Sequence, residues 1–251
     1  MIYNEKILNT LLGSSKKNNY LEIAQELNIP FKSIDKIRKI LITRNSEEIT
    51  SAIRTIYFNR INIEEKLHIL KLLPEIVDVE KDWPCAIGQL EQRVMNLMKL
   101  INKNNIREIL EQWGNDAEAY LIRRSIRYVL ASVIEYYFVL FDRTIVPTLV
   151  NRKGVDFYYR GLPFDEKTVR YSSNLPNNDR ALAKQLYSKQ GEKRFNNDNR
   201  IFVVISPKDE INFEKIKESI KKFVKLDNPP IKISYIYKGV SYENLCYVIR
   251  I

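Results

Sequence analysis

Residues 154–167 read GVDFYYRGLPFDEK, and this stretch decides the fold of the second half of the chain. It is rich in aromatic and β-branched residues on both sides of Arg160-Gly161, a pair that suits a two-residue turn because glycine accepts positive φ. If these two residues form the turn, Tyr159 pairs with Leu162. The stretch therefore predicts a β-hairpin with one strand at 154–159 and a second at 162–171.

Counting outwards from that turn places Asp156 directly opposite Asp165, on the same face as Lys167, while Glu166 points the other way. Two opposed carboxylates repel each other, so something must compensate for their charge. A divalent cation would do so, and hard oxygen ligands suit Mg²⁺. Lys167 alone would also do so, as part of a structural salt-bridge cluster on the solvent face of an exposed hairpin. Both interpretations remain open at this point.

The elements on either side of the hairpin predict an α+β fold: a helical N-terminal region, then a mixed sheet flanked by helices. Helical spacing of apolar residues dominates the first half of the chain. A stretch between Pro74 and Pro84 mixes acids with Pro and Trp, and suggests a boundary that divides the chain into regions 1–80 and 81–251. In the second region we expect helices at 86–100, 117–141, 179–187 and 213–224, and further strands at 201–205, 231–237 and 245–251.

The composition narrows the function. Lys and Arg number 41 against 31 Asp and Glu, a net charge of +10 that points to a polyanionic partner, most simply double-stranded DNA. With a single histidine and no glycine-rich phosphate loop, histidine-rich zinc sites and nucleotide-binding motifs are disfavoured. The most apolar run, 128–141, is shorter than the ~20 residues that a membrane span needs. The two separated cysteines suit a cytoplasmic protein, and we expect no membrane association.

Residues 20–39 carry a second pattern. Ile23 and Leu27 lie on one helical face, Asn28 can adopt the left-handed conformation of a tight turn, and Ile34 and Ile37 return to the core. The segment resembles the helix-turn-helix of transcription regulators, with Asn28 where that family usually has glycine. The resemblance implies that the second helix presents Lys32, Ser33, Asp35 and Lys36 to a DNA groove. The alternative is an ordinary helical hairpin with solvated lysines.

The Asp156…Asp165-x-Lys167 layout on adjacent strands resembles the PD-(D/E)XK nuclease superfamily, which includes many type II restriction endonucleases. The expected order of elements over 117–251 is similar to the family core of helix, three strands, helix and strand. Val155 stands where the family name has proline. The resemblance implies that Asp156 and Asp165 hold Mg²⁺ together with the backbone carbonyl of Glu166. It also implies that Lys167 orients or activates the attacking water.

Some members of that superfamily add an acid from the first helix. Glu135 is the candidate, since it interrupts an apolar run and a buried carboxylate needs a partner. The alternative is that Glu135 pairs with an arginine or lies at the helix edge. Arg200 belongs to a basic set after the hairpin that could contact phosphates, although as an individual residue it is expected to be a solvated surface charge. His68 is expected to be structural.

Together these patterns predict a Mg²⁺-dependent endonuclease that hydrolyses DNA phosphodiester bonds, of the restriction type and acting as a homodimer. The main alternative is a non-enzymatic DNA-binding regulator that uses only the helix-turn-helix segment. A third possibility is a repair or phage-defence nuclease of loose specificity.

Overall fold

The computed structural model describes residues 1–76, 115–150, 154–191, 198–206, 209, 212–237 and 240–251. Within these ranges it is an α+β fold, as predicted, with N-terminal helices followed by a six-stranded mixed sheet. The helices are α1 (Glu5–Leu12), α2 (Lys17–Glu26), α3 (Ile34–Thr43), α4 (Ser46–Arg60), α5 (Ile63–Ile76), α8 (Asn115–Phe141), α9 (Asp179–Gly191) and α10 (Phe213–Lys225). The strands are β1 (Val146–Pro147), β2 (Phe157–Tyr159), β3 (Leu162–Arg170), β4 (Asn199–Ile205), β5 (Ile231–Tyr237) and β6 (Val240–Arg250). The helix expected at 86–100 lies outside the described residues.

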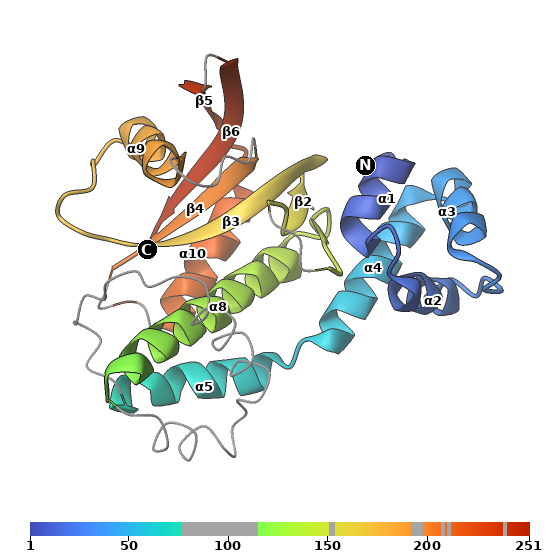
Figure 1. The fold of residues 1–251 in the computed structure, drawn as a ribbon, viewed down its shortest axis with the longest axis horizontal. Coiled ribbons are helices and arrows are strands. Elements are labelled where there is room, and N and C mark those ends of the chain that lie inside the picture. The colour runs from blue at the N-terminus through green and yellow to red at the C-terminus, as the bar shows by residue number, and fades with distance from the viewer. Residues whose placement is uncertain (77–114, 151–153, 192–197, 207–208, 210–211, 238–239) are drawn as a thin grey trace.

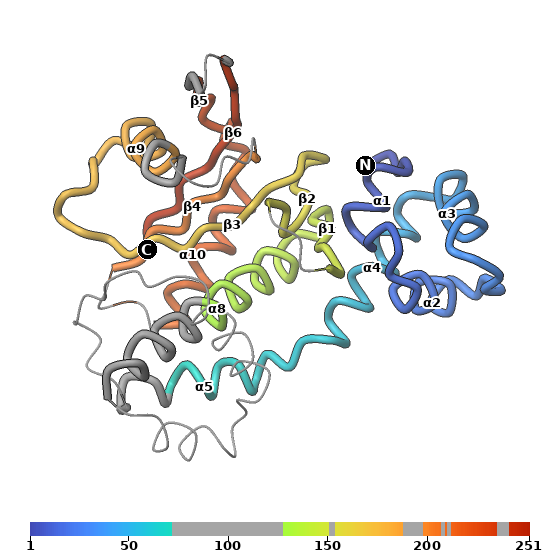
Figure 2. The backbone as a smooth tube through the Cα atoms, viewed as in Figure 1, coloured from blue at the N-terminus to red at the C-terminus, as the bar shows by residue number. Residues whose placement is uncertain are grey.

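The sheet has the strand order β1-β2-β3-β4-β6-β5 (Figure 1, with β1 labelled in Figure 2). Strands β1, β2 and β3 form an antiparallel meander, and α9 then carries the chain across so that β4 lies parallel to β3. On its other side β4 pairs in parallel with β6, and β5 closes the edge antiparallel to β6. The predicted hairpin thus lies next to the parallel centre of the sheet.

The hairpin turn forms as predicted. Tyr159 pairs with Leu162, and both turn residues have positive φ, 52° at Arg160 and 79° at Gly161. This is the turn geometry that matches the twist of the strands. Because a non-glycine residue rarely adopts positive φ, the turn needs outside support. The Arg160 guanidinium gives it by donating to the carbonyl of Leu226 at 3.0 Å and pairing with Asp227 at 2.8 Å.

The two faces of the sheet pack against different helices. Phe164, Ile201 and Tyr247 lie in a hydrophobic cluster with α8 and α10, whereas Phe202 and Cys246 lie in a cluster with α9. The predicted strand at 201–205 is one continuous run of apolar residues, and it is buried on both faces. Alternation along β3 therefore directs the even-numbered side chains toward α8 and the odd-numbered ones toward α9.

The N-terminal helices are packed onto this core. A third cluster joins residues of α1 to α4 with Val146 of β1 and Tyr158 of β2, while α5 contributes Leu70 to the cluster of α8. Figure 2 shows the path: the α1–α3 group lies beside β1 and β2, and α4 leads back to α5 beneath α8. Arg54 of α4 connects the N-terminal helices to the core by donating to the carbonyls of Asp142 and Ile145, each at 2.8 Å.

Some local predictions differ from the structure. The first hairpin strand is only Phe157–Tyr159, because Gly154, with φ of 95°, leads into a bend before it. Helix α9 begins at Asp179, as predicted, but extends to Gly191 instead of residue 187, and its N-cap is Asn178, whose Oδ1 accepts from the Ala181 amide at 3.0 Å. Asp179 instead pairs with Arg250 at 2.8 Å.

Candidate active site

Asp156 precedes β2, and Asp165 lies within β3. The strand ladder ends at the Phe157–Phe164 pair, since the Asp156 amide donates to the Phe164 carbonyl at 2.8 Å. The two aspartates are therefore not ladder partners. Asp165 nevertheless raises the pKa of Asp156, and Asp156 Oδ2 accepts from the backbone amide of Glu166, the residue next to Asp165, at 2.7 Å. The two acids therefore lie near each other, although not as the directly opposed pair that the sequence predicted.

Lys167 extends across this pair. Its Nζ donates to Asp165 Oδ1 at 2.6 Å and to the Glu166 carbonyl at 2.9 Å. Burial by itself would lower the pKa of Lys167, but attraction by Asp165, Asp156 and Glu166 outweighs it and the pKa is raised. The lysine is therefore an ammonium at neutral pH. It joins the Asp165 carboxylate and the Glu166 carbonyl, two of the three groups that the resemblance to the nuclease superfamily assigned to the metal.

The acids of β3 are buried, so the hairpin face is not solvated there, but the ion pair of Lys167 with Asp165 that the salt-bridge alternative expected is present. Asp165 is 5% exposed and Glu166 is 3% exposed. Burial, and then repulsion by Asp165, raises the pKa of Asp156 to about 6, against the opposing effects of Lys167 and the Glu166 amide. A carboxyl group with a pKa this close to neutrality is characteristic of functional sites, although structural ion-pair networks also produce such shifts.

Glu135 of α8 belongs to the same electrostatic cluster. Burial followed by repulsion from Asp156 raises the pKa of Glu135 to about 8, while Lys167 and Lys66 oppose the shift. Burial and repulsion by Glu135 also place the pKa of Glu166 well above its usual range, and Thr168 donates to its Oε1 at 3.0 Å. The interruption in the apolar run of this helix thus marks an acid that acts on the hairpin carboxylates.

Two cations near the acids were not predicted as site residues. Lys66 of α5 is partly buried, which lowers its pKa, and it acts on Glu135. Arg200 of β4 was expected to be a solvated surface charge, but it is 6% exposed, and its Nε lies 3.5 Å from Asp165 Oδ2. Nothing in the sequence signals Lys66, since it lies in a charged helical stretch. Arg200 lies near Asp165 because these two residues pair in the parallel β3–β4 ladder. A reader of the sequence would have to know that β3 and β4 are neighbours in the sheet to predict this contact.

The donor set is compatible with a hard divalent cation. Within the described ranges, no three His, Cys, Asp or Glu side chains are grouped so that they could hold a metal ion. Mg²⁺, however, usually takes one or two carboxylates and keeps several waters. Asp156, Asp165 and the Glu166 carbonyl offer that kind of oxygen donor set. An ion at this position would have to share Asp165 Oδ1 and the Glu166 carbonyl with Lys167.

The helix-turn-helix candidate lies in the N-terminal helices. Asn28 has φ of 53°, the left-handed conformation that the sequence predicted, and Ile37 is fully buried. The connection between α2 and α3 runs from residue 27 to 33, because Pro30 remains in the loop and α3 begins only at Ile34. That connection is longer than the usual 3–4-residue turn of the motif.

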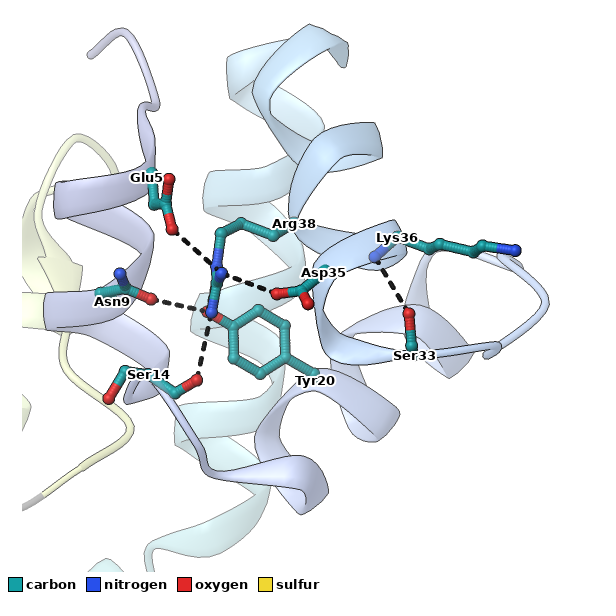
Figure 3. Close-up of polar contacts among 8 residues, drawn as sticks. All are labelled: Glu5, Asn9, Ser14, Tyr20, Ser33, Asp35, Lys36 and Arg38. Carbon is teal, nitrogen blue, oxygen red and sulfur yellow. Dashed lines mark hydrogen bonds and ion pairs between the residues drawn. The ribbon is translucent and has the colours of Figure 1, made fainter.

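The residues assigned to DNA contact lie around the start of α3. Lys32 and Lys36 are exposed, and the Lys36 side chain extends away from the helical bundle (Figure 3). Ser33 is the N-cap of α3, and its Oγ accepts from the Lys36 amide at 3.3 Å. Asp35 does not act alone, since it pairs with Arg38 at 3.0 Å.

Arg38 fixes the orientation of α3. Its guanidinium donates to Glu5 at 3.0 Å, to the Ser14 carbonyl at 3.1 Å and to the Tyr20 hydroxyl at 3.4 Å (Figure 3). These contacts reach α1, the α1–α2 connection and α2. The exposed lysines of α3 are thus presented by a helix whose rotation is set by polar contacts to three neighbouring segments.

Comparison of the chain with protein-family models, with curated proteins and with solved structures finds no match. Among the helices of the described residues, none has both the length and the apolar character needed to cross a membrane.

Proposed function

We propose that this chain is a Mg²⁺-dependent DNA endonuclease of the restriction type and a member of the PD-(D/E)XK superfamily. The observation that carries the proposal is the grouping of Asp156, Asp165 and Lys167, on whose charges Glu135 of α8 also acts. Asp156 is the residue just before β2, and Asp165 and Lys167 come from β3. The order α8, β1, β2, β3, α9, β4 is the one expected of that superfamily's core, and it supports the proposal at the level of fold analogy.

In this proposal Asp156, Asp165 and the Glu166 carbonyl hold Mg²⁺. When bound, the cation would lower the pKa of a water molecule bound to it and neutralise negative charge on the phosphate. Lys167, which carries a positive charge in the metal-free protein, would stabilise negative charge near the scissile phosphate or orient the attacking water. Glu135, with a pKa of about 8, holds a proton at neutral pH before any ligand binds.

A cleavage assay tests the proposal. Purified protein is incubated with varied double-stranded DNA and Mg²⁺ or Mn²⁺, with and without excess chelator. We expect cleavage that the chelator abolishes, loss of cleavage in Asp156→Asn and Lys167→Met, and full activity in Glu218→Gln. Glu218 lies on α10 and pairs with Lys221 at 3.2 Å, so this control removes one carboxylate outside the cluster. Cleavage that persists in excess chelator contradicts the metal mechanism.

A second candidate is a DNA-binding regulator without catalysis. The observation in its favour is the left-handed Asn28 together with the exposed Lys32 and Lys36 on a firmly held α3. In either function these lysines contact phosphates, which makes binding salt-dependent. A regulator would bind DNA without cutting any substrate, and its binding would not depend on Asp156.

The N-terminal contact has its own test. Lys32→Ala combined with Lys36→Ala should weaken DNA binding and reduce the slope of log K against log salt by about 2, or about 1 for each lost phosphate contact. The matched control is Lys222→Ala with Lys225→Ala, which removes two exposed positive charges from α10. An equal loss in both double variants would mean that net charge, and not α3, accounts for binding.

The remaining parts of the proposal follow from the function. An enzyme that cuts both strands of a duplex is expected to act as a homodimer, because the two strands are related by two-fold symmetry. A cytoplasmic location gives access to DNA and suits the free buried Cys246. A repair or phage-defence nuclease would share the same chemistry and would show looser sequence preference in the cleavage assay.

A further inference from the structure

Each oxygen of the Asp165 carboxylate has its own cation. Lys167 Nζ lies 2.6 Å from Oδ1, and Arg200 Nε lies 3.5 Å from Oδ2. Arg200 is the residue of β4 that pairs directly with Asp165 in the parallel ladder, so both side chains leave the sheet on the same face. The side chains of Asp165 and Arg200 are each 7% exposed, so solvent screens this pair little.

The guanidinium is held from several directions. It lies over the ring of Tyr187 from α9, 5.1 Å from the ring centroid, and the Tyr187 hydroxyl donates to the Asp198 carbonyl at 3.1 Å. The start of β4 is fixed as well. Asn199 donates from Nδ2 to the Pro163 carbonyl at 3.2 Å and accepts at Oδ1 from the Leu245 amide at 2.9 Å.

These contacts determine what Arg200 can do. A side chain that is buried against Tyr187 cannot reach a DNA phosphate without leaving its packing. It can act on the site through Asp165, 3.5 Å from its Nε. Arginine also suits this place because it stacks on aromatic faces and keeps its charge under all ordinary conditions.

We propose that Arg200 is a positioning residue that holds the Asp165 carboxylate toward Asp156, so that the two acids can bind a divalent cation together. The inference rests on the proposed function, because it assigns Asp165 to the metal. Loss of a residue that orients a metal ligand typically costs roughly 10–100-fold in metal affinity or activity.

The test measures Mn²⁺ binding by calorimetry on the full chain without DNA, together with steady-state cleavage. For Arg200→Gln we expect the Mn²⁺ Kd to rise by roughly 10–100-fold and kcat to fall, with KM for DNA unchanged. Arg200→Lys, which keeps the charge, should recover part of the affinity. Tyr187→Phe, which keeps the ring under the guanidinium, should bind Mn²⁺ as the wild type does, whereas Tyr187→Leu should bind it more weakly.

The readout separates the possible roles of Arg200. If it only repelled the metal, Arg200→Gln would bind Mn²⁺ more tightly, and if it only stabilised the fold, the variant would melt earlier with an unchanged Kd. Either result overturns the inference. If Arg200→Gln does not fold, Arg200→Lys and the two Tyr187 variants decide by the same criterion. If the wild-type protein binds no Mn²⁺, the proposed function is overturned together with the inference. If the wild type binds Mn²⁺ and Arg200→Gln binds it equally well, only the inference is overturned.

Discussion

Replacing Asp156 by asparagine should stabilise the protein when metal is removed. The pKa of Asp156 rises from 3.8 to about 6 on folding, chiefly through burial and then through repulsion by Asp165. At about 1.4 kcal/mol for each pKa unit, the ionised carboxylate costs ~3 kcal/mol of folding free energy at pH 8. Asparagine has almost the same shape, and its carbonyl can still accept from the Glu166 amide. We expect Asp156→Asn to gain about 1–3 kcal/mol.

The gain in stability from Asp156→Asn should depend on pH. A carboxyl group whose pKa is raised on folding stabilises the folded state fully below its unfolded pKa, and this contribution is lost as the pH rises through the folded value. For Asp156 that window extends from about pH 4 to about pH 6. The gain from Asp156→Asn should therefore be near zero at pH 4 and complete at pH 8.

Asp165 provides the contrast, because it lies between two cations. Asp165→Asn leaves Lys167 and Arg200 facing a neutral side chain. Breaking a buried pair in this way costs ~3–5 kcal/mol, but the Lys167 side chain is 38% exposed, so about 1–3 kcal/mol is the expected loss. Urea unfolding in excess chelator at pH 4, 6 and 8 measures both variants. A gain in Asp165→Asn, or a pH-independent effect of Asp156→Asn, would refute this account of the cluster.

Three further changes test other parts of the structure. Glu135→Gln should make the free energy of unfolding less dependent on pH between about 4.5 and 8. The reason is that the raised pKa of Glu135 makes the wild type lose stability as the pH rises across that window. Urea unfolding in excess chelator measures this difference. Gly154→Ala should lower the melting temperature, since a Cβ there would collide with the Asp198 carboxylate and the position has φ of 95°. Arg38→Met should weaken DNA binding in a titration at low salt, with a smaller change in salt slope than the Lys32 and Lys36 variant, because it loosens α3 without removing an exposed phosphate contact.

The hairpin could be predicted from sequence because its signals are local. The Arg160-Gly161 turn and the Tyr159–Leu162 pair follow from residues that are neighbours in the chain. The burial of 201–205 likewise follows from one continuous apolar run. These features depend on turn chemistry and periodicity, which a short window of sequence contains.

The charge balance of the site could not be predicted, because it depends on segments distant in the chain. Counting outwards from the turn indicated that Asp156 and Asp165 repel each other, with Lys167 as one possible compensating charge. The structure places Arg200 beside Asp165 through the β3–β4 pairing, and Lys66 acts on Glu135 from α5. The two aspartates, equivalent in the sequence pattern, therefore differ in what their removal should do.

The contacts of α4 bear on how DNA binding and cleavage could work together. Arg60 donates to Glu22 and Asn19 of α2 at 2.7 and 2.8 Å, and so fixes α4 to the helix that packs against α3. Arg54, earlier on α4, donates to the carbonyls just after α8, the helix that carries Glu135. A chain of hydrogen-bonded helices therefore joins the exposed lysines of α3 to the acids of the hairpin. If α3 binds DNA and the hairpin acids cut it, the contacts of α4 would help to fix the position of the duplex relative to Asp156 and Asp165.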